Sequence, residues 1–497
     1  MAASSQLSID SLPTWATLQD VKLQQVAMRR INGKGYGLVA EDTLNASEDV
    51  NKTSEIIRIP AELVLSGEAI EEYAKVDHHF KELIEKAGRK STRLDIMLYL
   101  LVHIVSARHM EDKTRRCVPT PWTEYIKFLP KHIPVPTLWS EPHQLLLRGT
   151  SLEDALSAKV MALESEFDKL RDTSANIPFW NRLLWEEDGA TLSDWLLVDA
   201  WYRSRCLELP QASHAMVPAL DMVNHSADGA TAYYEEEIGG DVSLRIRPGA
   251  VVAAGDEINI SYGDSKSAAE MLFSYGFFDP ESKTRQLTLQ LDGFDDDPLA
   301  LAKRRVFGGA PVVTLRQPEN SGDDANGGKL WDSGLVYLMC VNEEDGLDFR
   351  TLQNDAGDRE LRVFWQEEDV TERAGDFETL LRSHPLWALF QLRAVSVVQD
   401  KAMNQLEKLA AAPSSEQLGP LIAADIIDQA HVDLVAALKE IEHSVLEAVV
   451  NQLEEEKAQL LEHESVVAYF ELMEDGQNEL AQDDDPPAVA SGDDDFS

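Results

Sequence analysis

Cysteine is scarce in this sequence. The chain of 497 residues has only three, Cys117, Cys206 and Cys340, which are far apart and form no CxxC pair. This pattern argues against a Cys-based zinc site and favours a reducing compartment. It also excludes a Cys-rich zinc module.

Long apolar runs and targeting signals are missing as well. The longest apolar run, residues 96–105, contains His103 and is too short to span a bilayer. We expect it to form a buried helix. Residues 1–20 have no basic region followed by an apolar stretch, so we expect no secretory signal. The sequence therefore predicts no membrane partner and a location in the cytoplasm, the nucleus or both.

Basic residues are few compared with acidic ones, 45 against 88, which gives a net charge of −43. Such a field repels nucleic acid phosphates and attracts basic proteins. Two interpretations stay open, namely solubility alone or steering of a Lys-rich protein substrate. Part of the charge lies in an acidic tail, residues 476–497, whose Asp, Pro, Ala and Gly content predicts disorder.

The remaining chain is long enough for two or three domains. Glycine-punctuated apolar stretches predict short strands over 21–66, and alternating residues predict strands again over 215–260. Between them, apolar residues recur at helical spacing. After a mixed region, the chain is strongly helical from about residue 375. The fold class expected is α+β.

Four short motifs contain residues suited to binding chemistry. In Gly35-Tyr36-Gly37, two glycines let the backbone approach a ligand closely, although most such pairs are simple turns. Asn224-His225 ends an apolar segment, where burial requires hydrogen bonds. Its alternative interpretation is a polar turn between strands.

The other two motifs are aromatic and basic. Tyr262 ends a predicted strand, and Tyr275 follows thirteen residues later in the chain. A tyrosine there can orient an amine in a narrow channel, although grouped aromatics are usually core. Ser204-Arg205 offers a guanidinium that can bind a carboxylate bidentately, or form a surface ion pair.

In their order and spacing these motifs resemble the SET-domain lysine methyltransferases, specifically the branch of Rubisco large-subunit methyltransferase and the fungal ribosomal lysine methyltransferases. Residues 35–37 are similar to the opening motif and residues 221–226 to the central one. The helical segment is also similar, through Trp122, Tyr125, Leu129-Pro130, Trp139 and residues 147–150. The match of the C-terminal region is looser.

The resemblance implies a β-rich SET domain with a helical insertion, followed by a mainly α-helical C-terminal substrate-binding domain. We place an N-terminal segment at 1–20, the SET domain at 21–280 with its insertion at about 67–200, and the C-terminal domain at 281–475. The acidic tail follows. We expect a monomer.

The resemblance also assigns roles to residues. The expected cofactor is S-adenosyl-L-methionine, and its expected contacts are Gly35, Tyr36, Gly37, Arg205, Asn224, His225 and Tyr275. The carbonyls of Ser204 and Asp221 and the hydroxyl of Tyr262 are expected to surround the substrate lysine, with Tyr262 as the catalytic residue. Where this branch often has Lys-Ser-Asn, the chain has Lys266-Ser267-Ala268, which puts the asparagine's polar contact in doubt.

Methyl transfer from a sulfonium is an in-line displacement, so the protein must chiefly align amine, methyl and sulfur. This reaction needs neither a metal nor a covalent nucleophile, which agrees with the absence of a His/Cys cluster and of a Ser-His-Asp pattern, so we expect no metal site. The expected activity is protein-lysine N-methylation of a basic, non-histone protein, such as a ribosomal protein. Histone methylation and a degenerate SET-fold module that only binds basic proteins remain the alternatives.

Overall fold

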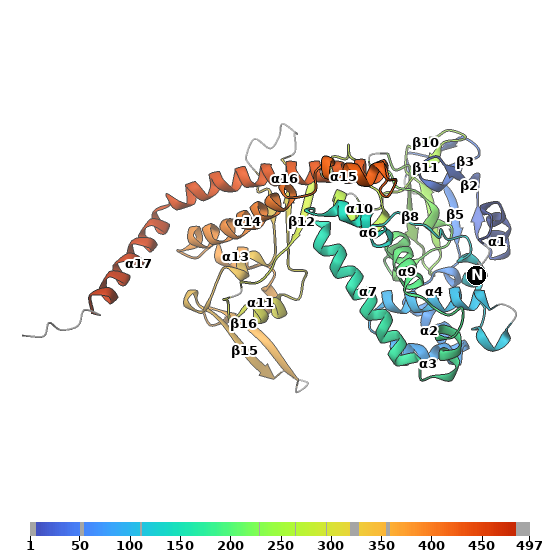
Figure 1. The fold of residues 1–497 in the computed structure, drawn as a ribbon, viewed down its shortest axis with the longest axis horizontal. Coiled ribbons are helices and arrows are strands. Elements are labelled where there is room, and N and C mark those ends of the chain that lie inside the picture. Colours follow the sequence, from blue (N-terminus) through green and yellow to red (C-terminus); the bar gives the residue numbers. More distant parts are fainter. Residues whose placement is uncertain are drawn as a thin grey trace, which may run out of the picture. The chain divides into compact units, whose positions relative to one another are not determined.

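The computed structural model describes residues 6–49, 54–109, 112–227, 229–263, 265–294, 296–318, 328–353 and 358–483 (Figure 1). The chain divides into two compact units. The first unit contains Met1–Arg148, Leu152–Thr284 and Pro413–Leu438, and the second contains Gly149–Ser151, Arg285–Ala412 and Lys439–Ser497. Among the described helices, none combines the length and the apolar character needed to cross a membrane.

The first unit contains several small antiparallel sheets. A four-stranded sheet has the order β1-β5-β9-β8, a three-stranded sheet has the order β11-β3-β2, and β10-β4 and β6-β7 are pairs. The strands are β1 (Lys22–Leu23), β2 (Val26–Ile31), β3 (Gly35–Ala40), β4 (Leu44–Asn45), β5 (Glu55–Ile59), β6 (Cys206–Leu209), β7 (Ser213–Met216), β8 (Ala232–Glu236), β9 (Val242–Ile246), β10 (Val251–Val252) and β11 (Glu257–Ile258).

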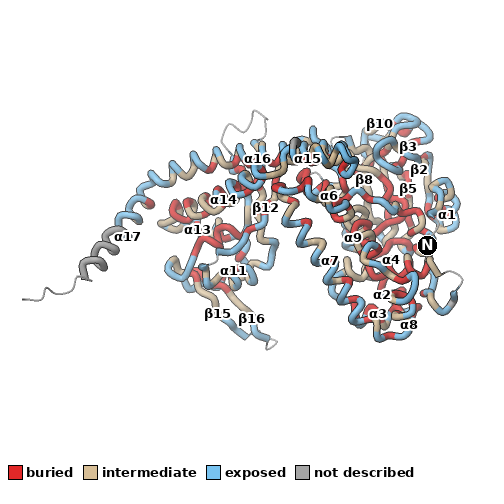
Figure 2. The backbone as a smooth tube through the Cα atoms, viewed as in Figure 1, coloured by how far each residue is buried: buried red, intermediate tan, exposed pale blue. Residues whose placement is uncertain are grey.

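A helical insertion separates β5 from β6, as the sequence predicted. Its helices are α2 (Gly67–Val76), α3 (His78–Ala87), α4 (Thr92–Arg108), α5 (Pro121–Tyr125), α6 (Glu141–Gln144), α7 (Leu152–Ser174), α8 (Pro178–Trp180) and α9 (Leu192–Arg205). Ser91 caps α4 by accepting a hydrogen bond from the Leu94 amide. The apolar run inside α4 is almost wholly buried (Figure 2), which confirms the predicted buried helix.

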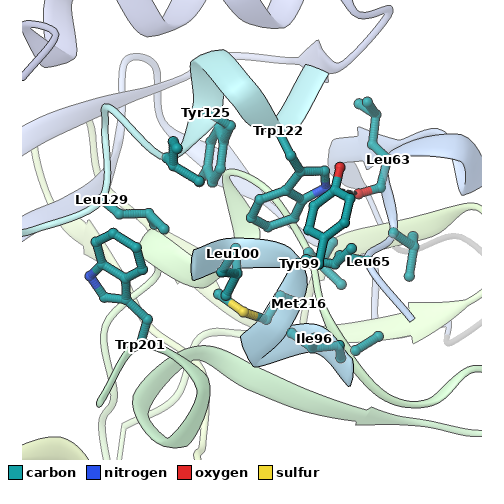
Figure 3. Packing of buried hydrophobic residues seen from close by; sticks show 14 of the residues in the cluster. Leu63, Leu65, Ile96, Tyr99, Leu100, Trp122, Tyr125, Leu129, Trp201 and Met216 are labelled. Atoms are coloured by element: carbon teal, nitrogen blue, oxygen red, sulfur yellow. Dashed lines mark hydrogen bonds between the residues drawn. The ribbon is translucent and has the colours of Figure 1, made fainter. Parts of the chain in front are cut away.

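Aromatic residues of the insertion join the core of the first unit (Figure 3). The Trp122 indole donates a hydrogen bond to the Leu63 carbonyl at 2.9 Å, and the Trp201 indole donates to the Pro130 carbonyl at 2.7 Å. Each buried ring therefore has its polar atom satisfied. These bonds fix the insertion against the segment after β5 and hold α9, whose C-terminal end carries Ser204 and Arg205.

The second unit begins with strands rather than helices. Two three-stranded sheets, β12-β13-β14 and β15-β16-β17, precede the long helices. Its strands are β12 (Gln286–Gln290), β13 (Val312–Arg316), β14 (Trp331–Asp332), β15 (Leu347–Gln353), β16 (Arg359–Trp365) and β17 (Glu368–Asp369). The expected helical domain therefore matches the later part of this unit. Its earlier part forms strands, because apolar and polar residues alternate there, as in Gln-Leu-Thr-Leu-Gln of β12.

The helices after the first unit's strands are α10 (Ala268–Tyr275), α11 (Ala300–Phe307), α12 (Val336–Met339), α13 (Phe377–Leu381), α14 (Trp387–Ala410), α15 (Ser415–Ala423), α16 (Gln429–Leu461) and α17 (Glu464–Asp483). Helix α17 continues into the tail that was expected to be disordered from residue 476. Its last residues include Glu, Leu, Ala and Gln, which favour helices. The rest of the expected tail, 484–497, lies outside the described residues.

Candidate active site

Strand β3 presents an open glycine edge. It pairs with β2 along its whole length, but its pairing with β11 is limited to Leu38 and Val39. Gly35 has a φ of +81°, a conformation that favours glycine, and a Cβ atom there would meet open space. A Cβ atom on Gly37 would instead lie 2.7 Å from Nδ2 of Asn224. Gly37 is thus required for the close approach of Asn224.

The side chain of Asn224 links this edge to β11. Its Nδ2 donates hydrogen bonds to the Tyr36 carbonyl at 3.2 Å and to Oε1 of Glu257 at 2.7 Å. The other oxygen of Glu257 accepts from Nζ of Lys34 at 3.0 Å. Glu257 was not predicted from the sequence, because its role depends on the β3–β11 pairing. The turn before it, Gly255-Asp256, was the available signal.

Two segments far apart in the chain run side by side at the site. The Ile260 amide donates to the Asn224 carbonyl and the Ser226 amide donates to the Ile260 carbonyl, both at 3.0 Å. His225 and Ile260 form a parallel bridge. The Tyr262 amide donates to Nδ1 of His225 at 3.0 Å. The structure therefore places the Asn224-His225 pair directly beside Tyr262, as the proposed site requires.

Other aromatic side chains contact the Tyr262 ring, and its hydroxyl is hydrogen-bonded. This hydroxyl donates to the Val223 carbonyl at 2.7 Å. The Tyr262 ring stacks on His225 with centroids 5.1 Å apart and lies 4.6 Å from the Tyr275 ring. Phe277, which the sequence analysis did not single out, lies 6.4 Å from both His225 and Tyr275. Burial raises the pKa of Tyr262 well above its usual value and that of Tyr275 to about 12, so both phenols are neutral near pH 7.

Helix α10 carries Tyr275 into this group. Ser267 caps the helix in a reciprocal pair with Glu270. Before it, Nζ of Lys266 donates to the Tyr262 carbonyl at 2.5 Å and lies 5.9 Å from the centre of the Tyr275 ring. Ala268, where the family often has asparagine, is the buried first residue of the helix. Lys266 thus ties the two tyrosines together without that asparagine.

Arg205 and Asp221 form a buried polar pair. Nη1 of Arg205 donates to the Asp221 carbonyl at 2.6 Å and lies 3.7 Å from Oδ2 of the same residue. Tyr125, hidden in the helical insertion, donates to Oδ1 of Asp221 at 2.5 Å and accepts from the Ala219 amide at 2.7 Å. Burial raises the pKa of Asp221, and Arg205 opposes that rise. Tyr125 was expected only as a family-like residue, and its contact with Asp221 is new.

The Arg205–Asp221 pair and Glu257 are close enough to Tyr262 to act on it electrostatically. Besides burial, the charges that shift the pKa of Tyr262 include those of Arg205, Asp221 and Glu257. Ser204 joins the group through its chain neighbour Arg205, while its own hydroxyl donates to the Ala200 carbonyl within α9. All the residues expected at the site thus lie on segments that meet here.

The arrangement fits the amino-acid end of S-adenosylmethionine. Nε of Arg205 and Oδ2 of Asp221 are buried without a hydrogen-bond partner among the described residues. Buried polar groups of this kind call for a partner, which a bound molecule with a carboxylate and an ammonium group can provide. Gly35 and Tyr36 are exposed at the open edge of β3, where a bound molecule can reach them.

The structure shows a cluster of ligand-type side chains that the sequence did not reveal. The sequence showed no His/Cys cluster, but the structure groups His143, Asp428 and His431 with ligand atoms within 4.8 Å of one another. Their separation along the chain, 285 residues between His143 and Asp428, conceals the cluster in the sequence. It lies on α6 and at the start of α16, not among the residues described above.

Comparisons with known proteins agree with this geometry. "SET domain-containing protein 8" of Schizosaccharomyces pombe is 24% identical over 389 residues, which cover 77% of this chain and 83% of that protein. The Rubisco large-subunit N-methyltransferase of Pisum sativum is 26% identical over 287 residues, which cover 55% of this chain and 53% of the pea protein. No protein-family profile matches the chain.

A solved structure has the same fold. The SET domain of LSMT bound to lysine and AdoHcy superimposes with a TM-score of 0.63 at 19% identity, over 96% of this chain and 98% of that one. A β-rich domain with a helical insertion, the meeting of residues 223–226 with 259–262 and these relatives lead to one assignment. The chain is similar in sequence and in fold to the SET-domain protein-lysine methyltransferases, in the branch that contains Rubisco large-subunit methyltransferase.

Proposed function

We propose that this enzyme transfers a methyl group from S-adenosylmethionine to a lysine side chain of a basic, non-histone protein, with ribosomal proteins as the first candidates. When bound, the cofactor supplies an electrophilic methyl group on a sulfonium. The observation that carries the proposal is the orientation of Tyr262. Its hydroxyl proton is committed to the Val223 carbonyl at 2.7 Å, beside the residues that suit the cofactor.

This hydrogen bond determines how the Tyr262 hydroxyl can contact a substrate. With its proton donated to Val223, the phenol oxygen has its lone pairs left to accept a hydrogen bond. A neutral lysine amine has two N–H groups to donate and one lone pair for attack. An acceptor on one side of the amine therefore directs the lone pair toward the methyl group. The Ser204 carbonyl is the proposed second acceptor.

In this proposal the Asp221 carbonyl accepts hydrogen bonds from both Arg205 and the substrate amine. In the structure this oxygen accepts from Nη1 of Arg205. A carbonyl has two lone pairs, so one remains for the substrate amine. The guanidinium keeps further N–H groups for the cofactor carboxylate, which it can bind bidentately.

Loss of the lysine proton must precede transfer. The reference pKa of a lysine is about 10.4. A buried channel disfavours the charged ammonium and lowers that pKa. Tyr262 is not the base in this proposal, because burial raises the pKa of its phenol and its proton is already bonded to Val223. The chain thus selects and orients the neutral amine.

The net charge of the chain favours a basic substrate. With 88 acidic and 45 basic residues, the chain attracts basic proteins over distances set by salt. Its cysteine content leaves no Cys-rich zinc module. The pea relative, by its name, acts on a metabolic enzyme rather than a histone. These points favour a basic protein outside chromatin.

The test uses purified full-length protein and S-adenosylmethionine with a labelled methyl group. Ribosomal proteins, core histones and total extract from cells lacking the gene are incubated in parallel, with Tyr262→Phe as the inactive control. We expect label on a discrete ribosomal or other non-histone protein, with wild-type enzyme only. Label confined to histones would overturn the substrate proposal while leaving the reaction intact. Normal cofactor affinity by calorimetry without any transfer would indicate a binding module instead.

A further inference from the structure

A second cluster of ligating groups lies on α6 and at the start of α16, both within the first unit. Oδ2 of Asp428 lies 3.1 Å from Nε2 of His143 and 2.7 Å from Nδ1 of His431. The two imidazole rings are 4.6 Å apart. One carboxylate oxygen therefore lies between two ring nitrogens.

The carboxylate is held in this position by the helix that follows it. Oδ1 of Asp428 accepts from the His431 amide at 3.0 Å, as an N-cap residue does for the third residue of a helix. This bond uses one oxygen for the cap and leaves Oδ2 directed at the histidines. The second ligand, His431, sits on the same first turn of α16. Two of the three groups are thus fixed by one local structure.

Neighbouring residues orient both rings. Nδ1 of His143 lies 2.6 Å from the Ser140 hydroxyl, so Nε2 faces Asp428. The Trp139 ring packs edge-on against His431 with centroids 4.7 Å apart. Hydrogen bonds that fix the tautomer of a ligating histidine are usual around protein metal sites. The side chains of His143 and His431 are 18% and 28% exposed, so an ion can reach them from solvent.

The ligand types select among metals. Two imidazoles and one carboxylate suit Zn²⁺ and similar transition metals, whereas Mg²⁺ and Ca²⁺ prefer oxygen alone. With Zn–N and Zn–O distances of about 2.0–2.2 Å, tetrahedral ligand atoms are about 3.3 Å apart. The separations of 3.1 and 2.7 Å from Asp428 are close to that value. The simpler alternative is a proton shared between Asp428 and the histidines.

We propose that His143, Asp428 and His431 bind one divalent transition-metal ion of the Zn²⁺ type, with water at the fourth position. The ion fastens α6 of the helical insertion to the beginning of α16. Residues 413–438 return to the first unit from late in the chain, and the ion joins their end to it. The site is independent of the methyl-transfer chemistry.

The experiment measures metal binding by the full-length protein after treatment with a chelator. Zn²⁺ is titrated by calorimetry, and Co²⁺ is added as a visible probe of tetrahedral coordination. We expect one ion per chain, and a loss of at least tenfold in affinity for His143→Gln and for His431→Gln. His443→Gln is the matched control, because His443 pairs with Glu447 at 3.8 Å elsewhere on α16. Its affinity should equal that of wild type.

Asp428→Asn keeps a side chain that can cap α16 and removes the charged ligand. We expect its Zn²⁺ affinity also to fall at least tenfold. If circular dichroism shows that a histidine variant does not fold, Asp428→Asn tests the metal site in its place. Absence of stoichiometric Zn²⁺ binding by the wild type would overturn the proposal. Equal affinity in the wild type, the histidine variants, Asp428→Asn and His443→Gln would also overturn it.

Discussion

At the scale of single residues, Tyr262 offers the sharpest test of mechanism. Replacing it by Phe removes the hydroxyl that bonds to Val223 but keeps the ring that stacks between His225 and Tyr275. We expect turnover to fall by two or more orders of magnitude, the size of effect seen when a transition-state hydrogen-bond partner is removed. Cofactor affinity, measured by calorimetry, should change little.

Tyr337→Phe is a matched control for this substitution, because Tyr337 is a buried tyrosine on α12 of the second unit. It should leave turnover close to that of wild type. If Tyr262→Phe reduced cofactor affinity as strongly as turnover, Tyr262 would be a cofactor contact and its proposed role would be wrong.

Asn224 is expected to act on cofactor binding first. Asn224→Ala removes the hydrogen bonds that link Tyr36 at the open edge of β3 to Glu257 on β11. A loss of about 1–2 kcal/mol corresponds to a roughly 5- to 30-fold weaker Kd for S-adenosylmethionine. Calorimetry measures it, with Asn181→Ala as a control on a side chain bonded only weakly to Glu186. Unaltered affinity would mean that Asn224 has no part in the cofactor site.

The residues of the motifs could be identified from the sequence, but the side chains that hydrogen-bond to them could not. Gly35-Tyr36-Gly37, Asn224-His225 and Tyr262 could be chosen by residue type and order. Glu257 and Tyr125 could not, because each matters only through pairing or packing with a distant segment. A lone Glu or Tyr has no distinguishing pattern until the strands and helices around it are placed.

At the scale of elements, Tyr125 connects the helical insertion to the site. Tyr125→Phe leaves Oδ1 of Asp221 and the Ala219 amide without their buried partner. We expect the free energy of unfolding to fall by about 1–3 kcal/mol. Urea denaturation followed by circular dichroism measures this change. Tyr469→Phe, on the partly exposed face of α17, should have little effect, and equal stability of the two variants would contradict the proposed link.

Helix α16 contains a group that makes stability depend on pH. Glu442 is buried and accepts from the amide and hydroxyl of Ser151, both residues being in the second unit. Burial raises its pKa to about 7, so the folded state binds the proton more tightly than the unfolded state does. Its contribution to stability is therefore full below about pH 4.5 and is lost as pH rises through 7.

Glu442→Gln should remove this dependence. Between pH 5 and pH 8 we expect the wild type to lose about 3 kcal/mol of unfolding free energy relative to the variant. Denaturant titrations at the two pH values measure the difference. Glu447→Gln, at an exposed position of the same helix, is the control. Parallel curves for wild type and Glu442→Gln would show that Glu442 is ionised at both pH values.

Elements were predictable where their pattern was long or simple. The apolar run in α4 and the alternation in β9 gave correct expectations. The tail was expected to be disordered from residue 476, but α17 continues to Asp483, because composition alone does not mark where a helix ends. The short strands of the second unit gave only a mixed signal, since strands of two residues such as β14 and β17 have no period to detect.

At the scale of the whole molecule, charge should govern the encounter with substrate. If the acidic field steers a basic protein, raising salt from 50 to 300 mM should reduce kcat/KM for that protein several-fold. Steady-state kinetics with the full-length substrate measure this effect. A neutral peptide carrying the same lysine serves as control and should be nearly insensitive to salt. If kcat/KM depended equally on salt for both substrates, the net charge would contribute to solubility and not to substrate steering.

The return of residues 413–438 to the first unit could not be inferred from the sequence. It depends on the path of the entire second unit, and it alone brings Asp428 and His431 to His143. Motifs with local order, such as those at 35–37 and 221–226, need no such knowledge. This difference explains why the candidate methyltransferase site was predicted and the cluster of His143, Asp428 and His431 was not.

The central claim is that Tyr262 and the residues around Asn224 form a site that methylates lysine. The most direct measurement is mass spectrometry of substrate labelled by wild-type enzyme and by Tyr262→Phe, with the modified side chain identified in each labelled peptide. We predict methyl groups on the ε-nitrogen of lysine with the wild type and almost none with the variant. Label on another kind of side chain, or equal labelling by both proteins, would contradict the account.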